Sequence, residues 1–203
     1  MSSYEDARGH ALAVVVTQAL YIAAVVANLV IVFCLINGVT AVEPYSGFSD
    51  GAVLATFFIA ALAFAVWTWR VVDNARSFKP SMNATPGWAI GWYFVPIASL
   101  FKPFGYMEET WDASSSVVSR RSSMLLRWWW GLWLVSGILG SLGNIFSRAE
   151  AQTGQFGTGL GMIVISLILR VGVSALVMKL ALQLAAMQRE KRRGVGTEAE
   201  VFA

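Results

Sequence analysis

Four stretches of this chain are apolar enough and long enough to cross a membrane, and they constrain its fold more than any other feature. They span residues 11–36, 51–69, 125–146 and 157–178. About 20 helical residues cross roughly 30 Å of hydrocarbon. Helix is the expected conformation because a lone span in lipid must satisfy its backbone hydrogen bonds internally. The sequence therefore predicts an all-α fold, an integral membrane bundle of four transmembrane helices.

Composition supports the same class. Hydrophobic residues make up 57% of the 203 positions and charged residues only 13%, which is more apolar surface than a soluble domain of this length can bury. The net charge of +3 comes from basic residues beside the spans, so we expect membrane lipids as partners and no nucleic acid. The single cysteine, Cys34, lies among apolar residues, which excludes an intramolecular disulfide.

The basic residues predict the orientation of the spans. The linker at 37–50 has no lysine or arginine, whereas the segment between the second and third spans carries Arg70, Arg76, Lys79, Lys102, Arg120, Arg121 and Arg127. More basic residues follow the last span. By the positive-inside rule, that middle segment and both termini face the cytoplasm of a multi-pass protein in the cell (inner or plasma) membrane.

All nine tryptophans lie between Trp67 and Trp133, and the run at 86–103 reads PGWAIGWYFVPIASLFKP. Its apolar part is too short to cross a membrane, and Pro96 removes a helical hydrogen bond near its centre. We therefore expect an interfacial or a re-entrant element on the cytoplasmic face, and the sequence leaves both arrangements open.

The residues that follow predict an amphipathic helix along the membrane surface, since Phe104, Met107, Trp111 and Val118 recur at roughly helical spacing while Ser116 and the acidic residues fall elsewhere. We expect residues 1–188 to form a single transmembrane domain. The polar residues 189–203 are predicted to be a disordered cytoplasmic tail.

The middle segment resembles a known family. The strings that carry the resemblance are WTWRVVDNARSF, TPGWAIGWYFVPIASLFKPFGYMEETWDAS and RWWWGLWLVS. They are similar to the bacterial membrane family called domain of unknown function 4328 over residues 67–135. The matching positions are Arg70, Asn74, Ala75, Pro86, Trp88, Trp92, Pro96, Pro103, Glu109 and Trp111. Ser99 stands where the family pattern has asparagine, and the resemblance implies no activity.

The sequence does not predict an enzyme. His10 is the only histidine and has no cysteine near it, so the usual metal and haem ligand sets lack donors. There is no Gly-x-Ser-x-Gly motif, no dinucleotide-binding glycine pattern after a strand and no P-loop lysine. We expect no cofactor, metal or catalytic residue.

Arg170 lies near the middle of the last span, where an ionisable group costs at least ~2.5 kcal/mol and needs a partner. The spans hold Asn28 and Asn144 as candidates. If the aromatic segment folds inward, Asp73, Glu108, Glu109 and Asp112 are further candidates, and Glu109 with Arg170 would form a polar chamber. The alternative is that Arg170 extends to the cytoplasmic interface beside Lys179.

Two other groups have structural interpretations. Arg70 and Asn74, one helical turn apart, are expected to cap the end of the second span and tie it to the aromatic segment. Arg127 with Trp128, Trp129 and Trp130 is predicted to anchor the third span at the headgroups.

These observations favour a non-enzymatic binding or accessory module that acts on lipid or on another membrane protein. One alternative is a small transporter or channel-like protein that uses Arg170 and the broken aromatic segment, since discontinuous helices line many transport sites. A third interpretation is a membrane enzyme that uses Glu108, Glu109 or Asp112 as acid and base on a lipid-borne substrate.

Overall fold

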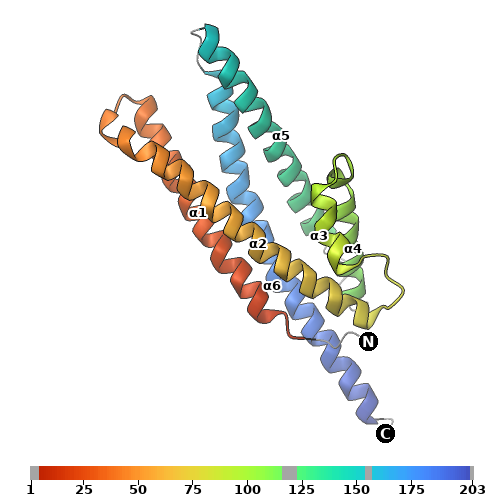
Figure 1. Ribbon diagram of the computed structural model, residues 1–203. Helices are drawn as coiled ribbons and strands as arrows, with labels where there is room; N and C mark the ends of the chain where they lie inside the picture. The colour runs from red at the N-terminus through yellow and green to blue at the C-terminus, as the bar shows by residue number, and fades with distance from the viewer. Residues whose placement is uncertain (1–4, 116–122, 154–156, 202–203) are drawn as a thin grey trace. The chain divides into compact units, whose positions relative to one another are not determined.

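A computed structural model describes residues 5–115, 123–153 and 157–201. Its long helices are α1 (Arg8–Ile36), α2 (Ser46–Phe78), α5 (Ser123–Thr153) and α6 (Thr158–Val201) (Figure 1). Short elements are η1 (Thr40–Tyr45), α3 (Pro86–Gly91), η2 (Trp92–Phe94), η3 (Ala98–Leu100) and α4 (Lys102–Ser114). The described residues contain no strand, so the predicted all-α class is confirmed. Four of the described helices are long and apolar enough to cross a membrane, as predicted.

The helices run past the apolar stretches that the sequence marks. Helix α2 continues beyond residue 69 to Phe78, and α6 continues beyond residue 178 to Val201. Residues 189–201 are thus helical where the sequence predicts a disordered tail. Arginine, lysine and glutamate dominate the start of this extension, and all three are good helix formers.

The chain divides into two compact units, and each contains part of every long helix. The first unit is formed by described residues of the ranges 1–16, 61–127 and 177–203. The second unit is formed by those of 17–60 and 128–176.

In the second unit, α1, α2 and α6 share a small apolar core. Tyr21, Val25 and Ala60 are buried, and Leu167 and Val171 of α6 pack against them. Further along α1, the buried Asn28 amide donates to Ser49 Oγ at 3.1 Å and to Asp50 Oδ1 at 2.8 Å. This polar group is therefore satisfied between α1 and α2.

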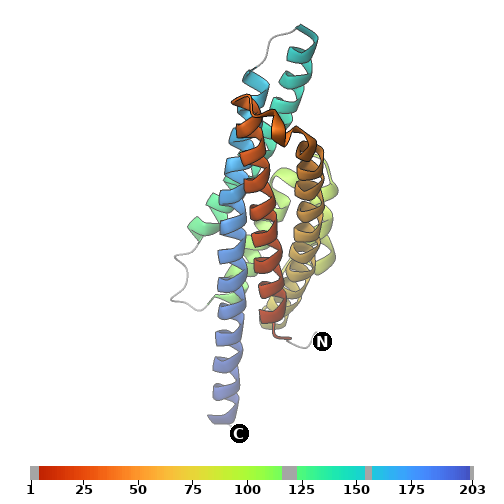
Figure 2. The same cartoon turned by 90° about the vertical axis from the view of Figure 1, so that its left-hand side faces the viewer.

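Helices α5 and α6 lie side by side in the second unit (Figure 2), and glycines allow a close approach between them. A Cβ on Gly143 would lie 2.8 Å from Ile163 Cγ1 and 3.0 Å from Gly159 O. A Cβ on Gly159 would overlap the backbone of Ser147. Small residues at such contacts let helix backbones pack in a membrane without a side chain between them.

The same end of this helix pair is held by Glu150. Its carboxylate accepts hydrogen bonds from the backbone N–H groups of Thr158 at 3.0 Å and Gly159 at 3.1 Å. An acidic side chain at a helix amino terminus accepts hydrogen bonds from the free N–H groups there and interacts favourably with the helix dipole.

Replacing Gly159 with alanine should lower the stability of the protein in detergent by about 1–3 kcal/mol, because its methyl group meets backbone that cannot move aside. Gly161→Ala is the matched control, since nothing lies within 4 Å of its Cβ position. Thermal unfolding of both variants checks this. Equal melting temperatures would contradict the close approach of α5 and α6.

Candidate functional site

The first unit is organised around the buried side chain of Asn74, near the end of α2. Its Nδ2 donates to Glu5 O at 2.7 Å and to Gln188 Oε1 at 3.1 Å, and its Oδ1 accepts from Glu5 N at 3.1 Å. Asn74 is 1% exposed, and these bonds give both polar atoms of its amide protein partners in place of water. One side chain thus joins the amino-terminal segment, α2 and α6.

Gln188 extends this network to α4. It is fully buried, and its Nε2 donates to Val71 O at 2.8 Å and to Ser114 Oγ at 3.0 Å. Ser114 Oγ in turn donates to Thr110 O at 2.7 Å. The ends of α2, α4 and α6 are therefore linked through polar side chains that no solvent reaches.

Charged side chains reinforce the same junction at its edge. Arg70 Nη1 lies 2.6 Å from Glu5 Oε2, with the two side chains 28% and 57% exposed. Lys191 Nζ donates to Ala113 O at 2.6 Å and lies 5.6 Å from the centre of the Phe78 ring. The sequence predicts that Arg70 and Asn74 tie α2 to the aromatic segment, whereas their described bonds go to the amino-terminal segment and α6.

Glu5 and Gln188 are the partners that sequence reasoning missed. Gln188 did carry a signal, because Ala181, Leu184 and Ala185 precede it at helical spacing and are buried. A polar residue on such a stripe needs a hydrogen-bond partner. Glu5 carried none, since it lies in a short polar segment.

Residues 84–113, which we call the Pro/Trp hairpin, start and end at this junction. Arg76 Nη1 donates to Ala84 O at 3.0 Å, and Glu109 accepts from Asn83 N and Ala84 N, both at 2.9 Å. Ala84 and Ala113 belong to one core cluster with Val72, Ala75, Met82 and Ala89. Both ends of the hairpin therefore lie at the same end of α2.

The hairpin runs back along α2 (Figure 1). Pro86 occupies the first turn of α3, where its missing N–H is tolerated. A Cβ on Gly87 would lie 3.8 Å from the Trp69 ring, and Tyr93 meets Phe64 edge to face with ring centres 6.4 Å apart. Successive hairpin residues thus contact α2 at positions progressively farther from its end.

The chain reverses at a strained turn. Ala98 N donates to Pro96 O at 2.7 Å, and Ile97 between them has φ 66° and ψ −53°. This is a γ-turn with its central residue in a region that a β-branched side chain rarely adopts. Pro103 then lies in the first turn of α4.

Aromatic rings stiffen the hairpin. Trp88 and Trp92 stack with centres 4.6 Å apart, and Tyr106 meets Trp92 edge to face at 6.4 Å. Lys102 Nζ lies 5.6 Å from the centre of the Trp92 ring, a cation–π distance.

Helix α4 is amphipathic as predicted, but its apolar face packs within the protein. Met107 and Trp111 are 3% and 2% exposed, so protein rather than lipid covers them. Ser116 and Val118, and with them the basic pair Arg120 and Arg121, lie outside the described residues.

The predicted tryptophan anchor is also only partly exposed. Trp128 is 59% exposed and Arg127 is exposed, but Trp129 and Trp130 are 2% and 7% exposed. The ring of Trp130 stacks on Trp133 at 4.7 Å. Trp129 and Trp130 are therefore core residues, and as the largest side chains they fill a large volume inside the protein.

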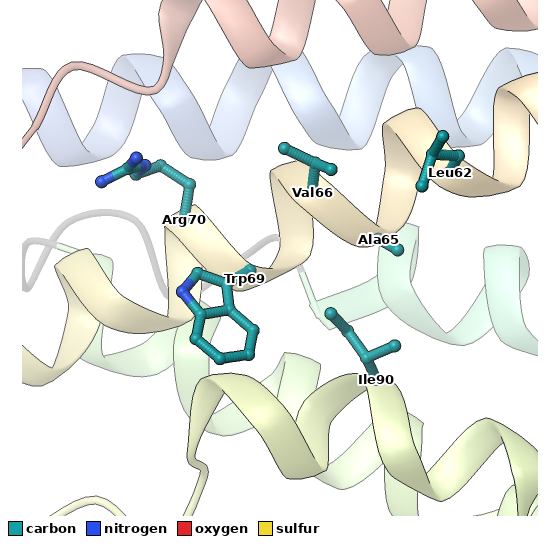
Figure 3. Close-up of a pocket in the computed structure, with 6 residues that line it drawn as sticks. All are labelled: Leu62, Ala65, Val66, Trp69, Arg70 and Ile90. Atoms are coloured by element: carbon teal, nitrogen blue, oxygen red, sulfur yellow. The ribbon is translucent and has the colours of Figure 1, made fainter.

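A groove of about 290 Å³ lies on α2 beside the hairpin (Figure 3). It is lined by Leu62, Ala65, Val66, Trp69, Arg70 and Ile90. Leu62, Val66 and Arg70 are four residues apart and form one row along α2, and Ile90 of α3 lies on the side of Ala65 and Trp69 (Figure 3). Arg70 is the only charged side chain in this lining.

Arg170 lies in the second unit, on the face of α6 toward α5. A Cβ on Gly140 would be 3.5 Å from Arg170 Nη2 and 3.2 Å from Ser166 Oγ, so the glycine makes room for both. Arg170 Nε is buried and has no hydrogen-bond partner in the described part of the chain. The Asn144 amide donates to Gly140 O at 2.8 Å instead. A polar chamber and an extended Arg170 both stay predictions.

The family follows from comparison with known proteins. The pattern of the family described as Domain of unknown function (DUF4328) matches residues 38–186, which is more than half of the chain. The chain belongs to this family. Searches of curated proteins and of solved structures found no significant match.

The DUF4328 match covers η1 through most of α6, and the structure places the signature residues together in the first unit. Glu109 fixes the start of the hairpin, and Arg70 and Asn74 hold the end of α2. The hairpin itself carries Pro86, Trp88, Trp92, Pro96, Pro103 and Trp111. Arg170 belongs to the other unit. No group of three or more potential metal ligands is found in the described ranges.

Replacing Asn74 with alanine should cost about 1–3 kcal/mol, because Gln188 Oε1 and the Glu5 backbone would lose their buried partner. Arg70→Gln should cost at most about 1 kcal/mol, since the ion pair it removes is partly exposed. Thermal unfolding in detergent measures both. Equal losses, or a larger loss for Arg70→Gln, would show that Asn74 does not hold the junction.

Proposed function

We propose that this DUF4328 protein is a non-enzymatic lipid-binding module of the bacterial cell membrane, whose Pro/Trp hairpin enters the cytoplasmic leaflet as a re-entrant element. The observation that carries the proposal is the exposed apolar tip of the hairpin. Phe94 is 81% exposed and Ile97 is 74% exposed, and Leu100 and Phe101 are each more than half exposed. Such a cluster is unfavourable in water and favourable in hydrocarbon.

The depth of the tip supports insertion. The apolar span in α2 ends near residue 69, and Tyr93 contacts Phe64, which lies about 7 Å deeper along the helix at about 1.5 Å per residue. A tip beyond Tyr93 would then reach roughly a quarter or more of the way into ~30 Å of hydrocarbon.

The strain at Ile97 supports a role for its side chain. A residue held in this backbone region costs of the order of 1–3 kcal/mol, and glycine would adopt it more easily. An isoleucine at this position places an exposed apolar side chain at the turn instead. Contact with lipid hydrocarbon offsets the strain in this proposal.

Orientation follows from charge. The junction carries Arg76 and Lys79, and the α6 extension carries Lys191 and Arg192. These side chains would meet anionic lipids of the cytoplasmic leaflet. Both termini then face the cytoplasm, and any protein partner would be another membrane protein.

Depth-dependent quenching tests the insertion. In a Cys34→Ser background, a bimane label on Phe94→Cys should be quenched by lipids with a nitroxide on the acyl chain and protected from iodide in water. The matched control is Ser81→Cys, whose position is exposed outside the hairpin and should show the opposite pattern. Iodide quenching of the Phe94→Cys label as strong as that of the control would overturn the re-entrant hairpin.

The buried, unpartnered Nε of Arg170 within the described chain favours transport as a second candidate function. A transport pathway would bring water to this residue. An Arg170→Cys variant in the Cys34→Ser background should then react with a membrane-impermeant thiol reagent from at least one side. No reaction from either side would eliminate transport through this position.

A further inference from the structure

We propose that the groove on α2 holds one acyl chain of a phospholipid, with the phosphate of that lipid bound by Arg70. The inference rests on the proposed function in taking lipid as the ligand, and it adds a defined site. Leu62, Val66 and Arg70 form one wall of the groove, Ala65 and Trp69 the next row, and Ile90 the opposite side (Figure 3).

The dimensions of the groove suit a single acyl chain better than a complete drug-sized molecule. From Leu62 to Arg70 the groove follows α2 for about 12 Å at about 1.5 Å per residue. Its volume of about 290 Å³ is at the lower limit of sites that enclose drug-sized molecules.

The groove is polar at one end only. Leu62, Val66 and Ile90 are apolar, and Arg70 lies at the end nearest the α2 terminus. A span in a bilayer is surrounded by hydrocarbon along its length and by lipid phosphate at its end. The acyl chain of a lipid beside α2 would therefore contact the apolar residues of the groove, and its phosphate would lie near Arg70. Trp69 is half exposed beside Arg70, and its indole suits the headgroup level.

Arg70 can bind a phosphate through the N–H groups that its described ion pair with Glu5 does not use. The contact with Glu5 involves Nη1, and a guanidinium has five N–H donors in a planar fork that matches phosphate oxygens. Lysine in the same place would keep the charge but lose the paired geometry.

Glu5 is therefore a competitor for the lipid phosphate. Its side chain is 57% exposed and contacts Arg70, while its backbone N–H and C=O are held separately by Asn74. Removing the carboxylate charge leaves the amino-terminal segment attached. Glu5→Gln should therefore free Arg70 and strengthen phospholipid binding without loosening the junction.

Native mass spectrometry of the full chain in mild detergent, titrated with dioleoyl phosphatidylglycerol, tests the site. Ala65→Phe fills the groove and should weaken binding of the first lipid about tenfold or more. Its matched control is Ala23→Phe, an exposed position of α1 outside the lining, which should bind as the unaltered protein does. Arg70→Gln should weaken binding more than Arg70→Lys, and Glu5→Gln should tighten it.

Thermal unfolding of each variant shows that it is folded before its binding is compared. Equal affinity of Ala65→Phe and Ala23→Phe would overturn the groove. Equal binding of glycerophosphoglycerol, which has the phosphate but no acyl chain, would overturn the acyl-chain assignment. Because quenching of the label at Phe94→Cys reports hairpin insertion separately, a failed groove leaves the proposed function standing and the two failures can be told apart.

Discussion

The buried amide of Asn74 is the interaction on which the first unit depends. It satisfies the backbone of Glu5 and the side chain of Gln188 together, and Gln188 passes the connection on to Val71 and Ser114. If they were unpaired, each of these buried groups would cost free energy, so the network permits few arrangements of the four segments that it joins. The amino-terminal segment, α2, α4 and α6 therefore meet at one place.

The contacts at that junction determine the position of the hairpin. Arg76 and Glu109 attach its start to the end of α2, and Ala84 and Ala113 pack in the same cluster. With both ends fixed there, the intervening residues can only extend along α2 and return. This course brings Ile90 beside α2 and creates the groove, while the turn at Ile97 carries the apolar side chains farthest from the junction.

Local patterns in the sequence predicted those features of the structure that depend only on neighbouring residues. Hydropathy located the four spans, because burial in lipid depends on each segment by itself. The prolines and tryptophans of 86–103 located the hairpin, and the amphipathic helix after it is present as α4. The family resemblance at 67–135 was confirmed by the match over 38–186.

Features that depend on distant partners were not predicted. Helix α6 extends beyond its apolar span partly because Gln188 and Lys191 bond to α2 and α4, which no local pattern reveals. Trp129 and Trp130 looked like interfacial residues, but tryptophan serves equally well as a large core side chain. The groove needs Ile90 beside α2, and that neighbour comes from the return of the hairpin.

The central claim is that the chain crosses the membrane four times and that the Pro/Trp hairpin starts and ends on one side. Single cysteines at Lys79, Asp112 and Val39 in a Cys34→Ser background, labelled in intact cells and in inverted vesicles, test it most directly. The account predicts that Lys79→Cys and Asp112→Cys react only from the cytoplasmic side and Val39→Cys only from the other. Labelling of the first two from opposite sides would contradict it.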